Sequence, residues 1–319
     1  MNKKQELFKM KELKIFAPAT IANVSCGFDI LGLCLDTVGD EMVIRKSNNR
    51  GVKIAKIDGQ DVPLEAEKNV AGVAILALLQ QLNADVGFEI EMYKKIKPGS
   101  GIGSSAASSA GAVFAVNKLL GDPFSTLELV GFAMQGEALA SGTAHADNVA
   151  PALYGGCTMV TSYDPLHVVK IPAPEALYAS VLHPQIEVKT ADSRSVLKEY
   201  VPLKSLVTQM GNFGGLISGL YTQDYNLISR SLHDEIIEPY RSILIPTFDK
   251  VKERCLQEGA LGSGISGSGP SIFALSKGEE TAKKVAKGMA EVYKETQIDF
   301  DVHRSKINPI GVKILDIIE

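Results

Sequence analysis

A segment rich in glycine and serine at residues 98–108 carries the residue types that bind phosphate. Its sequence is Pro-Gly-Ser-Gly-Ile-Gly-Ser-Ser-Ala-Ala-Ser. Glycines let backbone N–H groups approach an anion without obstruction by Cβ, and the start of a following helix adds unpaired N–H donors and a partial positive charge. A serine hydroxyl in the first helical turn is also a hard oxygen ligand for a divalent cation. The segment is therefore a candidate for binding the phosphates of a nucleotide.

The segment differs from two common phosphate-binding motifs. A Walker A loop ends in Gly-Lys-Ser/Thr, and no lysine follows these glycines. The dinucleotide fingerprint needs a third glycine further into the helix and an acidic residue about 20 residues on, and neither fits well. A tight turn without a ligand is the other interpretation, and the segment alone leaves the two open.

A second group of polar residues follows within a short stretch of the chain. It comprises Glu137, His145, Asp147 and Asn148. A carboxylate at Glu137 suits a Mg²⁺ shell that is shared with a loop serine and with phosphate oxygens. A glutamate in a helix is by default solvated, and a single histidine is usually structural. The cluster, and not any one member, therefore supports a site.

Two further pairs of residues suit the recognition of an ammonium and of a carboxylate. Asn23 and Asp29 lie in a turn-rich segment, where they either form a turn and a helix cap or point into a pocket towards an ammonium. Arg194 and Arg241 are either surface residues or bidentate ligands of a carboxylate. Thr190 is a candidate N-cap of the helix that carries Arg194. At this point both interpretations of each pair stay open.

The spacing of apolar residues predicts the elements that position these side chains. Residues 88–93 alternate between apolar and polar, as in a half-buried strand, and residues 104–120 have the composition and spacing of a helix. The glycines at 99–103 therefore lie between a strand and a helix. Ser125 and Glu128 match a capping box, which opens a further helix.

The rest of the chain alternates between strands and helices. Further strands are expected at 14–18, 41–45, 52–57, 179–183, 271–275 and 300–303, and further helices at 69–82, 204–220, 225–238 and 279–294. Residues 262–270 form a second glycine–serine cluster, and its apolar flanks favour an ordered loop over a flexible linker. Prolines between 165 and 174 mark a loop-rich join between two halves.

The composition narrows the class of protein. A chain of 319 residues is long enough for two domains, and a net charge of −4 gives no basic surface for nucleic acid. No window approaches the roughly 20 apolar residues of a membrane span, and the first 14 residues lack the apolar segment of a signal peptide. The four cysteines show no CxxC spacing. We therefore expect a cytoplasmic protein that binds neither nucleic acid nor membranes.

Three motifs in this order resemble the GHMP kinase superfamily, which includes galacto-, homoserine, mevalonate and phosphomevalonate kinases. They are Pro18-Ala-Thr-Ile-Ala-Asn23, the 98–108 segment and the 262–270 segment. The resemblance spans essentially the whole chain and is closest to the members that phosphorylate L-homoserine. Four groups carry this closer match: Asn23 with Gly27-Phe28-Asp29, Glu137 with His145-Ala-Asp-Asn148, Thr190 with Arg194, and Glu238-Pro-Tyr-Arg241.

The resemblance implies an α+β fold of two domains with the site between them. Residues 1–165 would form an N-terminal α/β domain that binds ATP and contains a left-handed βαβ unit, and residues 166–319 a ferredoxin-like α+β domain. Left-handed crossovers are rare, so only the resemblance supports that feature. It further implies that the 262–270 loop buttresses the phosphate loop and that the protein is a homodimer.

The resemblance also implies a role for each candidate residue. The co-substrate ATP would be bound by Pro98, Gly99, Ser100, Gly101, Ile102, Gly103, Ser104, Ser105, Ala106 and Ser108. L-homoserine would be bound by Asn23, Asp29, His145, Asn148, Thr190, Arg194 and Arg241. Within that set, Asp29 would bind the ammonium and the two arginines the carboxylate. Ser105 and Glu137 would hold Mg²⁺ and would be the catalytic residues together with Asn148.

Asn148 bears on the mechanism, because relatives such as mevalonate kinase carry an aspartate there that is thought to act as base. An amide cannot take a proton, although it can orient a hydroxyl by hydrogen bonding. Phosphoryl transfer can rely on positioning and charge stabilisation, because its transition state is loose. We therefore expect direct in-line transfer without a carboxylate base, with Asp147 as the alternative base.

Two other functions were weighed against this expectation. Another small-molecule kinase of the superfamily, acting on mevalonate or an isoprenoid alcohol, would leave Asp29, Arg194 and Arg241 without matching charges on its substrate. An inactive relative that senses a metabolite would be expected to have lost phosphate or metal residues, whereas Ser105 and Glu137 are present.

Overall fold

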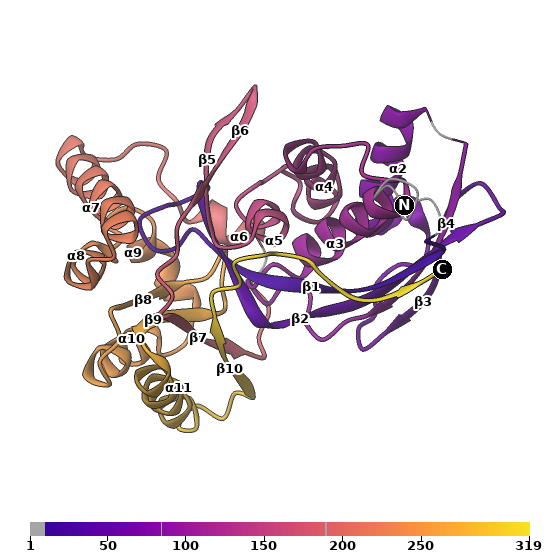
Figure 1. The fold of residues 1–319 in the computed structure, drawn as a ribbon. Helices are drawn as coiled ribbons and strands as arrows, with labels where there is room; N and C mark the ends of the chain where they lie inside the picture. The colour runs from indigo at the N-terminus through magenta and orange to yellow at the C-terminus, as the bar shows by residue number, and fades with distance from the viewer. Residues whose placement is uncertain (1–9, 84, 189) are drawn as a thin grey trace.

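The structure is a computed structural model that describes residues 10–83, 85–188 and 190–319, without the side chains of Ser141 and Thr190. Figure 1 shows two sheets that lie against each other, each with helices on its outer side. None of the helices in these ranges is long and apolar enough to cross a membrane.

The first sheet is built mainly from the N-terminal half of the chain. Its strands run in the order β11-β1-β2-β4-β3, and the β5–β6 hairpin joins it through β2. The bounds are β1 (Glu12–Ala22), β2 (Leu31–Ser47), β3 (Gly51–Asp58), β4 (Gly87–Tyr93), β5 (Cys157–Tyr163), β6 (Leu166–Ile171) and β11 (Lys313–Ile318). Neighbours β3 and β4 are parallel and are connected through α2 (Val70–Leu82), which makes the expected βαβ unit.

Helices α2, α3 (Ser104–Leu119), α4 (Thr126–Ser141) and α5 (Val149–Tyr154) lie on one face of this sheet (Figure 1). The central one, α3, is rich in alanine and is buried along nearly its whole length. Its Gly111 lies so close to β1 that a Cβ there would come within 2.8 Å of the Ala17 methyl. Small residues thus let α3 pack directly on the sheet, and this packing fixes the position of its N-terminus.

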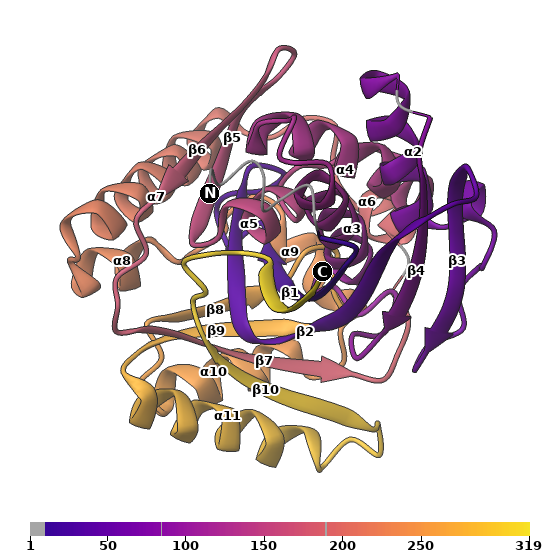
Figure 2. The ribbon, with the colours of Figure 1, turned by 45° about the vertical axis from the view of Figure 1, so that its right-hand side comes forward.

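The second sheet has the strand order β10-β7-β9-β8, with all neighbours antiparallel. Its strands are β7 (Leu177–Pro184), β8 (Gly262–Ile265), β9 (Ile272–Lys277) and β10 (Phe300–Lys306). Helices α10 (Phe248–Gln257) and α11 (Glu279–Tyr293) cover the side away from the first sheet (Figure 2). The chain order β7-α10-β8-β9-α11-β10 with this strand order is the ferredoxin-like arrangement that was expected.

One long helix, α7 (Leu203–Thr222), and three short helices lie between β7 and α10 in the chain, on the left of Figure 1. The short helices are α6 (Thr190–Ser195), α8 (Tyr225–Ser231) and α9 (Glu238–Arg241), with single 3₁₀ turns η1 (Ala66–Lys68) and η2 (Ser242–Leu244) elsewhere. The helix predicted at 225–238 is wrong beyond Ser231. The Asp234 carboxylate accepts hydrogen bonds from the backbone N–H groups of residues 236, 237 and 238 at 3.0 Å, and these bonds fold the chain into a turn instead.

The boundary predicted after residue 165 lies in the turn of the β5–β6 hairpin. Both β6 and the C-terminal strand β11 belong to the first sheet. The two sheets therefore do not divide the chain at that residue, because its last strand returns to pair with β1.

Candidate active site

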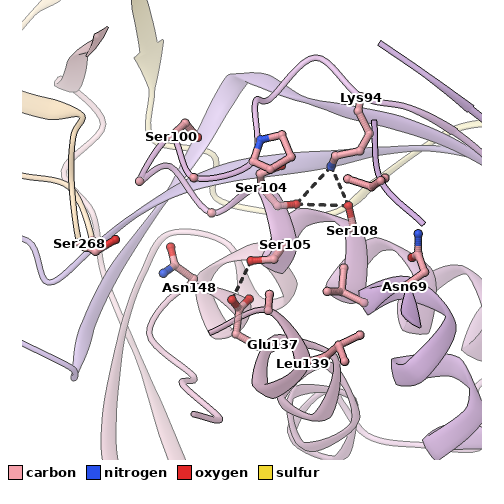
Figure 3. Close-up of a pocket in the computed structure, with 18 of the residues that line it drawn as sticks. Asn69, Lys94, Ser100, Ser104, Ser105, Ser108, Glu137, Leu139, Asn148 and Ser268 are labelled. Atoms are coloured by element: carbon pink, nitrogen blue, oxygen red, sulfur yellow. Dashed lines mark hydrogen bonds between the residues drawn. The ribbon is translucent and has the colours of Figure 1, made fainter. Parts of the chain in front are cut away.

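A cavity of about 590 Å³ lies between the two sheets. Its walls come from residues 62–70 before and at the start of α2, the loop between β4 and α3, the end of α4, the loop after β8, and Glu187, Val188 and Ala191. Figure 3 shows the polar side chains that line it, among them Lys94, Ser104, Ser105, Glu137, Asn148 and Ser268. The volume is in the range of small-molecule and cofactor sites.

The predicted phosphate segment forms the loop that enters α3. Gly99, Gly101 and Gly103 have φ angles of 73°, 81° and 70°, a left-handed conformation that L side chains rarely adopt. Space excludes a side chain as well, because a Cβ on Gly101 would lie 2.6 Å from the Gly269 carbonyl oxygen and one on Gly103 2.2 Å from Thr20 Oγ1. The α3 N-terminus therefore opens into the cavity with its N–H groups unobstructed.

The loop after β8 supports this segment from the second sheet. Ser266 Oγ donates to the Gly101 carbonyl at 2.7 Å, and Ser271 Oγ donates to the Ser100 carbonyl at 2.6 Å. The serines of the second glycine cluster thus fix the backbone of the first. An ordered loop, and not a linker, connects β8 to β9.

Lys94 is a lysine near the phosphate segment that precedes its glycines, whereas the lysine of a Walker A loop follows them. It precedes the loop, at the end of β4, and lies beneath the first turn of α3 (Figure 3). Its Nζ donates to Asp40 Oδ2 at 2.5 Å, to Ser108 Oγ at 2.8 Å and to the Ser104 carbonyl at 3.3 Å. Both members of the ion pair are buried. The pair joins β2, β4 and α3, so it also holds the loop in place.

Ser105 and Glu137 meet across the cavity wall. Ser105 Oγ donates to Glu137 Oε1 at 2.7 Å, and both residues line the cavity (Figure 3). Burial raises the pKa of the Glu137 carboxyl above its ordinary value, and the Ser105 hydroxyl acts in the opposite direction. A hydroxyl and a carboxylate beside a phosphate loop are hard oxygen donors, so the pair fits a Mg²⁺ ion.

Asn148 is held at the cavity by a residue of the first strand. Thr20 Oγ1 donates to Asn148 Oδ1 at 2.7 Å, which orients the amide and leaves its NH₂ group and the second lone pair of its oxygen for further hydrogen bonds. The neighbouring Asp147 is buried and does not line this cavity. Burial raises the pKa of the Asp147 carboxyl to about 7, with smaller contributions from Asp29 and Glu137.

Asp29, His145 and Arg194 form a hydrogen-bonded cluster. Arg194 Nη2 donates to the two carboxylate oxygens of Asp29 at 2.9 and 3.0 Å and lies 2.6 Å from His145 Nε2. Because a guanidinium only donates, His145 Nε2 is the acceptor, which leaves its proton on Nδ1 in the neutral ring. Burial lowers the pKa of His145, which favours this neutral form.

Arg241 completes the group of charged residues. It is buried, and its Nε and Nη1 donate to the carbonyls of Ser193 at 3.0 Å and Gly267 at 3.2 Å. The guanidinium centres of Arg241 and Arg194 lie 4.9 and 5.5 Å from the centroid of the Phe28 ring. Burial, and then the nearby Arg194, lower the pKa of Arg241 to about 10. The interpretation of Arg241 as a surface residue is thus wrong.

Asn23 has the structural role that was one of its two interpretations. Its Oδ1 accepts from the backbone N–H of Asp29 at 2.9 Å, and its Nδ2 donates to the Gly267 carbonyl at 2.7 Å. Asn23 and Asp29 both have positive φ angles, 69° and 59°. The amide thus ties the loop that carries Asp29 to the loop that also binds Arg241.

Most of the predicted residues form two groups that meet at Gly267, with three exceptions. One group lines the cavity, and the other (Asn23, Asp29, His145, Arg194 and Arg241) lies outside its lining. The side chains of Ile102 and Ala106 are buried in the hydrophobic core, and neither residue lines the cavity. The side chain of Thr190 lies outside the described part of the chain. The structure adds three residues to the candidate site, Thr20, Lys94 and Phe28. Their roles depend on contacts with residues far away in the sequence, which residue spacing does not predict.

Comparisons with known families place the chain clearly. Residues 69–156 match the model of the GHMP kinases N terminal domain, and residues 216–295 match that of the GHMP kinases C terminal. The homoserine kinase of Chlorobium phaeobacteroides is 43% identical over 96% of this chain and 100% of its own. That of Chloroherpeton thalassium is 43% identical over the same shares.

Solved structures agree with these matches. The crystal structure of homoserine kinase from Cytophaga hutchinsonii is 50% identical, covers 96% of this chain and 98% of its own, and superposes with a TM-score of 0.93. Mevalonate kinase from L. major is 16% identical, covers 93% and 95%, and has a TM-score of 0.66. The second likeness is one of fold alone.

Proposed function

The chain belongs to the homoserine kinase family of the GHMP kinases, and from that premise we propose how its residues carry out the reaction. The enzyme transfers the γ-phosphoryl group of ATP to the side-chain hydroxyl of L-homoserine, a step towards threonine. The arrangement that best supports this substrate is the Asp29–Arg194–Arg241 group beside a phosphate loop.

We propose that ATP occupies the cavity between the sheets, with its phosphates at the loop of residues 98–105. The left-handed glycines and the N-terminus of α3 present backbone N–H groups to the phosphate oxygens. Because Lys94 is already paired with Asp40, its main effect is to hold this loop in place. The serines that bond the loop from the second sheet keep it from moving when charge shifts during transfer.

We propose that Ser105 and Glu137 hold the Mg²⁺ ion. When bound, the ion neutralises charge on the phosphate oxygens. Burial of the Glu137 carboxyl raises its pKa and disfavours its ionised form in the absence of a cation, and a bound cation would favour the ionised form. Ser105 already lies 2.7 Å from one Glu137 oxygen, so little rearrangement is needed to make both groups face one ion.

We propose that the site binds L-homoserine in its zwitterionic form. Asp29 binds the ammonium, and Arg194 and Arg241 bind the carboxylate. Without substrate, Asp29 and Arg194 neutralise each other. Homoserine brings one charge for each partner, so binding replaces one ion pair within the protein by two between protein and substrate. A substrate without these charges would leave Asp29 or the arginines without the compensation they have in the free enzyme.

We propose that the transfer uses no carboxylate base. Asn148 can form hydrogen bonds with the substrate hydroxyl or with a phosphate oxygen, but an amide is not basic enough to take the proton. Asp147 has a pKa suited to a base, and like Asp29, Arg194 and Arg241 it does not line the ATP cavity, so the Asp147→Asn variant decides between the two mechanisms. The hydroxyl proton then leaves late, to the transferred phosphate, and the enzyme works by alignment and charge stabilisation.

The reaction can be tested by identifying its product. The protein is incubated with ATP, Mg²⁺ and L-homoserine, and the mixture is followed by proton-coupled ³¹P NMR. A phosphomonoester on a CH₂–O group gives a triplet that grows in step with ADP. Release of inorganic phosphate without this triplet would contradict the proposal.

We also propose that the protein is a homodimer in the cytoplasm, as its family resemblance implies. The four cysteines are free and buried, which suits a reducing compartment. Light scattering coupled to size exclusion would give twice the chain mass for a dimer, and a monomer mass would refute that part of the proposal.

A further inference from the structure

The β5–β6 hairpin is an arm of the first sheet that reaches the amino-acid cluster. In Figure 1 it extends beyond the sheet between α7 and α4. Its base is fixed next to Asp29, because Val160 N donates to the Ile30 carbonyl at 2.9 Å and Met159 pairs with Leu31. Strand β5 therefore runs from this anchor past the loop that carries Asp29, and it ends at Tyr163.

The Tyr163 hydroxyl connects two loops of the site. It donates to the Asp29 carbonyl oxygen at 2.8 Å and accepts from the Ala146 N–H at 3.4 Å. Asp29 is the residue whose carboxylate bonds Arg194, and Ala146 directly follows His145, whose ring also contacts Arg194. One hydroxyl thus bonds the backbone of Asp29 and the backbone of the residue that follows His145.

The surroundings of Tyr163 favour this role over one in packing. The residue is 41% exposed, so its ring contributes little to a core. Its hydroxyl nevertheless turns inward to the two loops and not to water. Asp29 has a φ of 59°, a conformation that costs a non-glycine residue free energy, and a hydrogen bond on its carbonyl helps to keep it there. Burial, and then the nearby Asp147, raise the pKa of Tyr163, so the hydroxyl keeps its proton and remains a donor.

We propose that Tyr163 is a positioning residue for the amino-acid substrate. Its hydroxyl fixes the spacing between Asp29 and His145, and through them the place of Arg194. The inference rests on the proposed role of this cluster in binding homoserine. Because the hydroxyl touches neither the phosphate loop nor its supports, its removal should affect one substrate and not the other.

The test compares Tyr163→Phe with Thr161→Val. The first removes only the hydroxyl and keeps the ring. The second removes a hydroxyl from the same strand that bonds His167 across the hairpin and does not reach the site. Steady-state KM values for homoserine and ATP, kcat and the thermal midpoint are measured for both variants and the wild type.

We expect Tyr163→Phe to raise the homoserine KM about 3- to 10-fold, the usual effect of losing a neutral hydrogen bond. The KM for ATP and the thermal midpoint should stay at the wild-type values, and Thr161→Val should match the wild type in every respect. An unchanged homoserine KM in Tyr163→Phe would overturn the inference. So would equal rises in both KM values, or the same rise in Thr161→Val, since either would indicate a general role of the hairpin.

These outcomes are separate from failure of the proposed function. A wild-type protein that forms no phosphomonoester from homoserine would overturn both. An active wild type with an unaffected Tyr163→Phe variant would overturn the inference on Tyr163 alone.

Discussion

Replacing Asp29 by Asn tests whether the ion pair in the free enzyme gives way to the substrate. The Asp29 carboxylate accepts two hydrogen bonds from Arg194 Nη2, at 2.9 and 3.0 Å. The two side chains are 32% and 36% exposed, so solvent screens the pair. Asn keeps the size of the side chain and removes its charge. The variant therefore loses both the pair with Arg194 and the proposed contact with the substrate ammonium.

The expected rise in the homoserine KM follows from the difference between the free energies of these two interactions. A charge-assisted hydrogen bond to the ammonium contributes about 1.5–3 kcal/mol. The partly exposed pair with Arg194, which substrate must break, contributes about 0.2–1 kcal/mol. Subtracting the second from the first leaves about 0.5–3 kcal/mol of lost binding, which is a rise in the homoserine KM of about 2- to 150-fold.

The assay uses a second substrate to locate the effect. 4-Hydroxybutanoate has the carboxylate and hydroxyl of homoserine but no ammonium. Asp29→Asn should leave its kcat/KM unchanged or raise it, because Arg194 is then free to bind the carboxylate. The matched control is Asp36→Asn, since Asp36 is also 32% exposed and paired with a cation, Lys313, away from the site. Equal losses of kcat/KM for homoserine and 4-hydroxybutanoate would refute the assignment of Asp29 to the ammonium.

The remaining predictions concern the metal, the carboxylate and the proton. Glu137→Gln should lower kcat by at least about 100-fold with an unchanged circular dichroism spectrum, because the charge of the transferring phosphate is less neutralised; wild-type kcat at saturating Mg²⁺ would contradict this. Arg241→Leu should raise the homoserine KM far more than the ATP KM, with only partial recovery in Arg241→Lys, because a point charge does not reproduce the fork; equal changes in both KM values would place the arginine on the nucleotide. Asp147→Asn should lower single-turnover kcat by less than about 10-fold, and Asn148→Ala by more than Asp147→Asn; a loss of about 100- to 10,000-fold in Asp147→Asn would identify Asp147 as the base. The pKa of Asp147 is raised from 3.8 to about 7, so the native state binds a proton more tightly than the unfolded chain does. The free energy of unfolding of the wild type should therefore fall as the pH rises from about 4 to 7. Urea titrations of Asp147→Asn should not show this fall.

Local patterns predicted many of the regular elements, but they missed α10 and the strands β5, β6 and β11. The spacing of valine, alanine and leucine predicted α2 and α3, and Ser125 with Glu128 forms the capping box at the start of α4. These features depend on neighbours within a turn or two, which a linear sequence displays. The helix predicted at 225–238 does not continue past Ser231. The turn there depends on which backbone N–H groups the Asp234 side chain reaches, and the spacing of apolar residues does not show this.

The site depends on contacts that the sequence does not display. Lys94 pairs with Asp40, and Arg194 pairs with Asp29 although 165 positions separate them. Their types made them candidates, yet no spacing rule links residues so far apart. The resemblance to a family supplied that link for Asp29 and Arg194. It supplied none for Lys94, whose position before the glycines matches no common phosphate motif.

The sequence did not predict the backbone conformation of the loop that carries Asp29 either. Asn23 and Asp29 adopt left-handed φ angles without being glycine, and this turns the Asp29 carboxylate towards Arg194. Such angles are held by tertiary contacts, here the Asn23 amide and the Tyr163 hydroxyl. A reading of the sequence could propose the residue types of the site, but their orientation required the fold.

We propose that this site phosphorylates homoserine because it binds an amino-acid zwitterion next to ATP. The most direct test measures ATP- and Mg²⁺-dependent ADP release by the wild-type protein with homoserine, serine, threonine, mevalonate and galactose in parallel. The account predicts the highest kcat/KM for homoserine, with mevalonate and galactose at the rate of ATP alone. Turnover of mevalonate or galactose, with homoserine at the background rate, would contradict it.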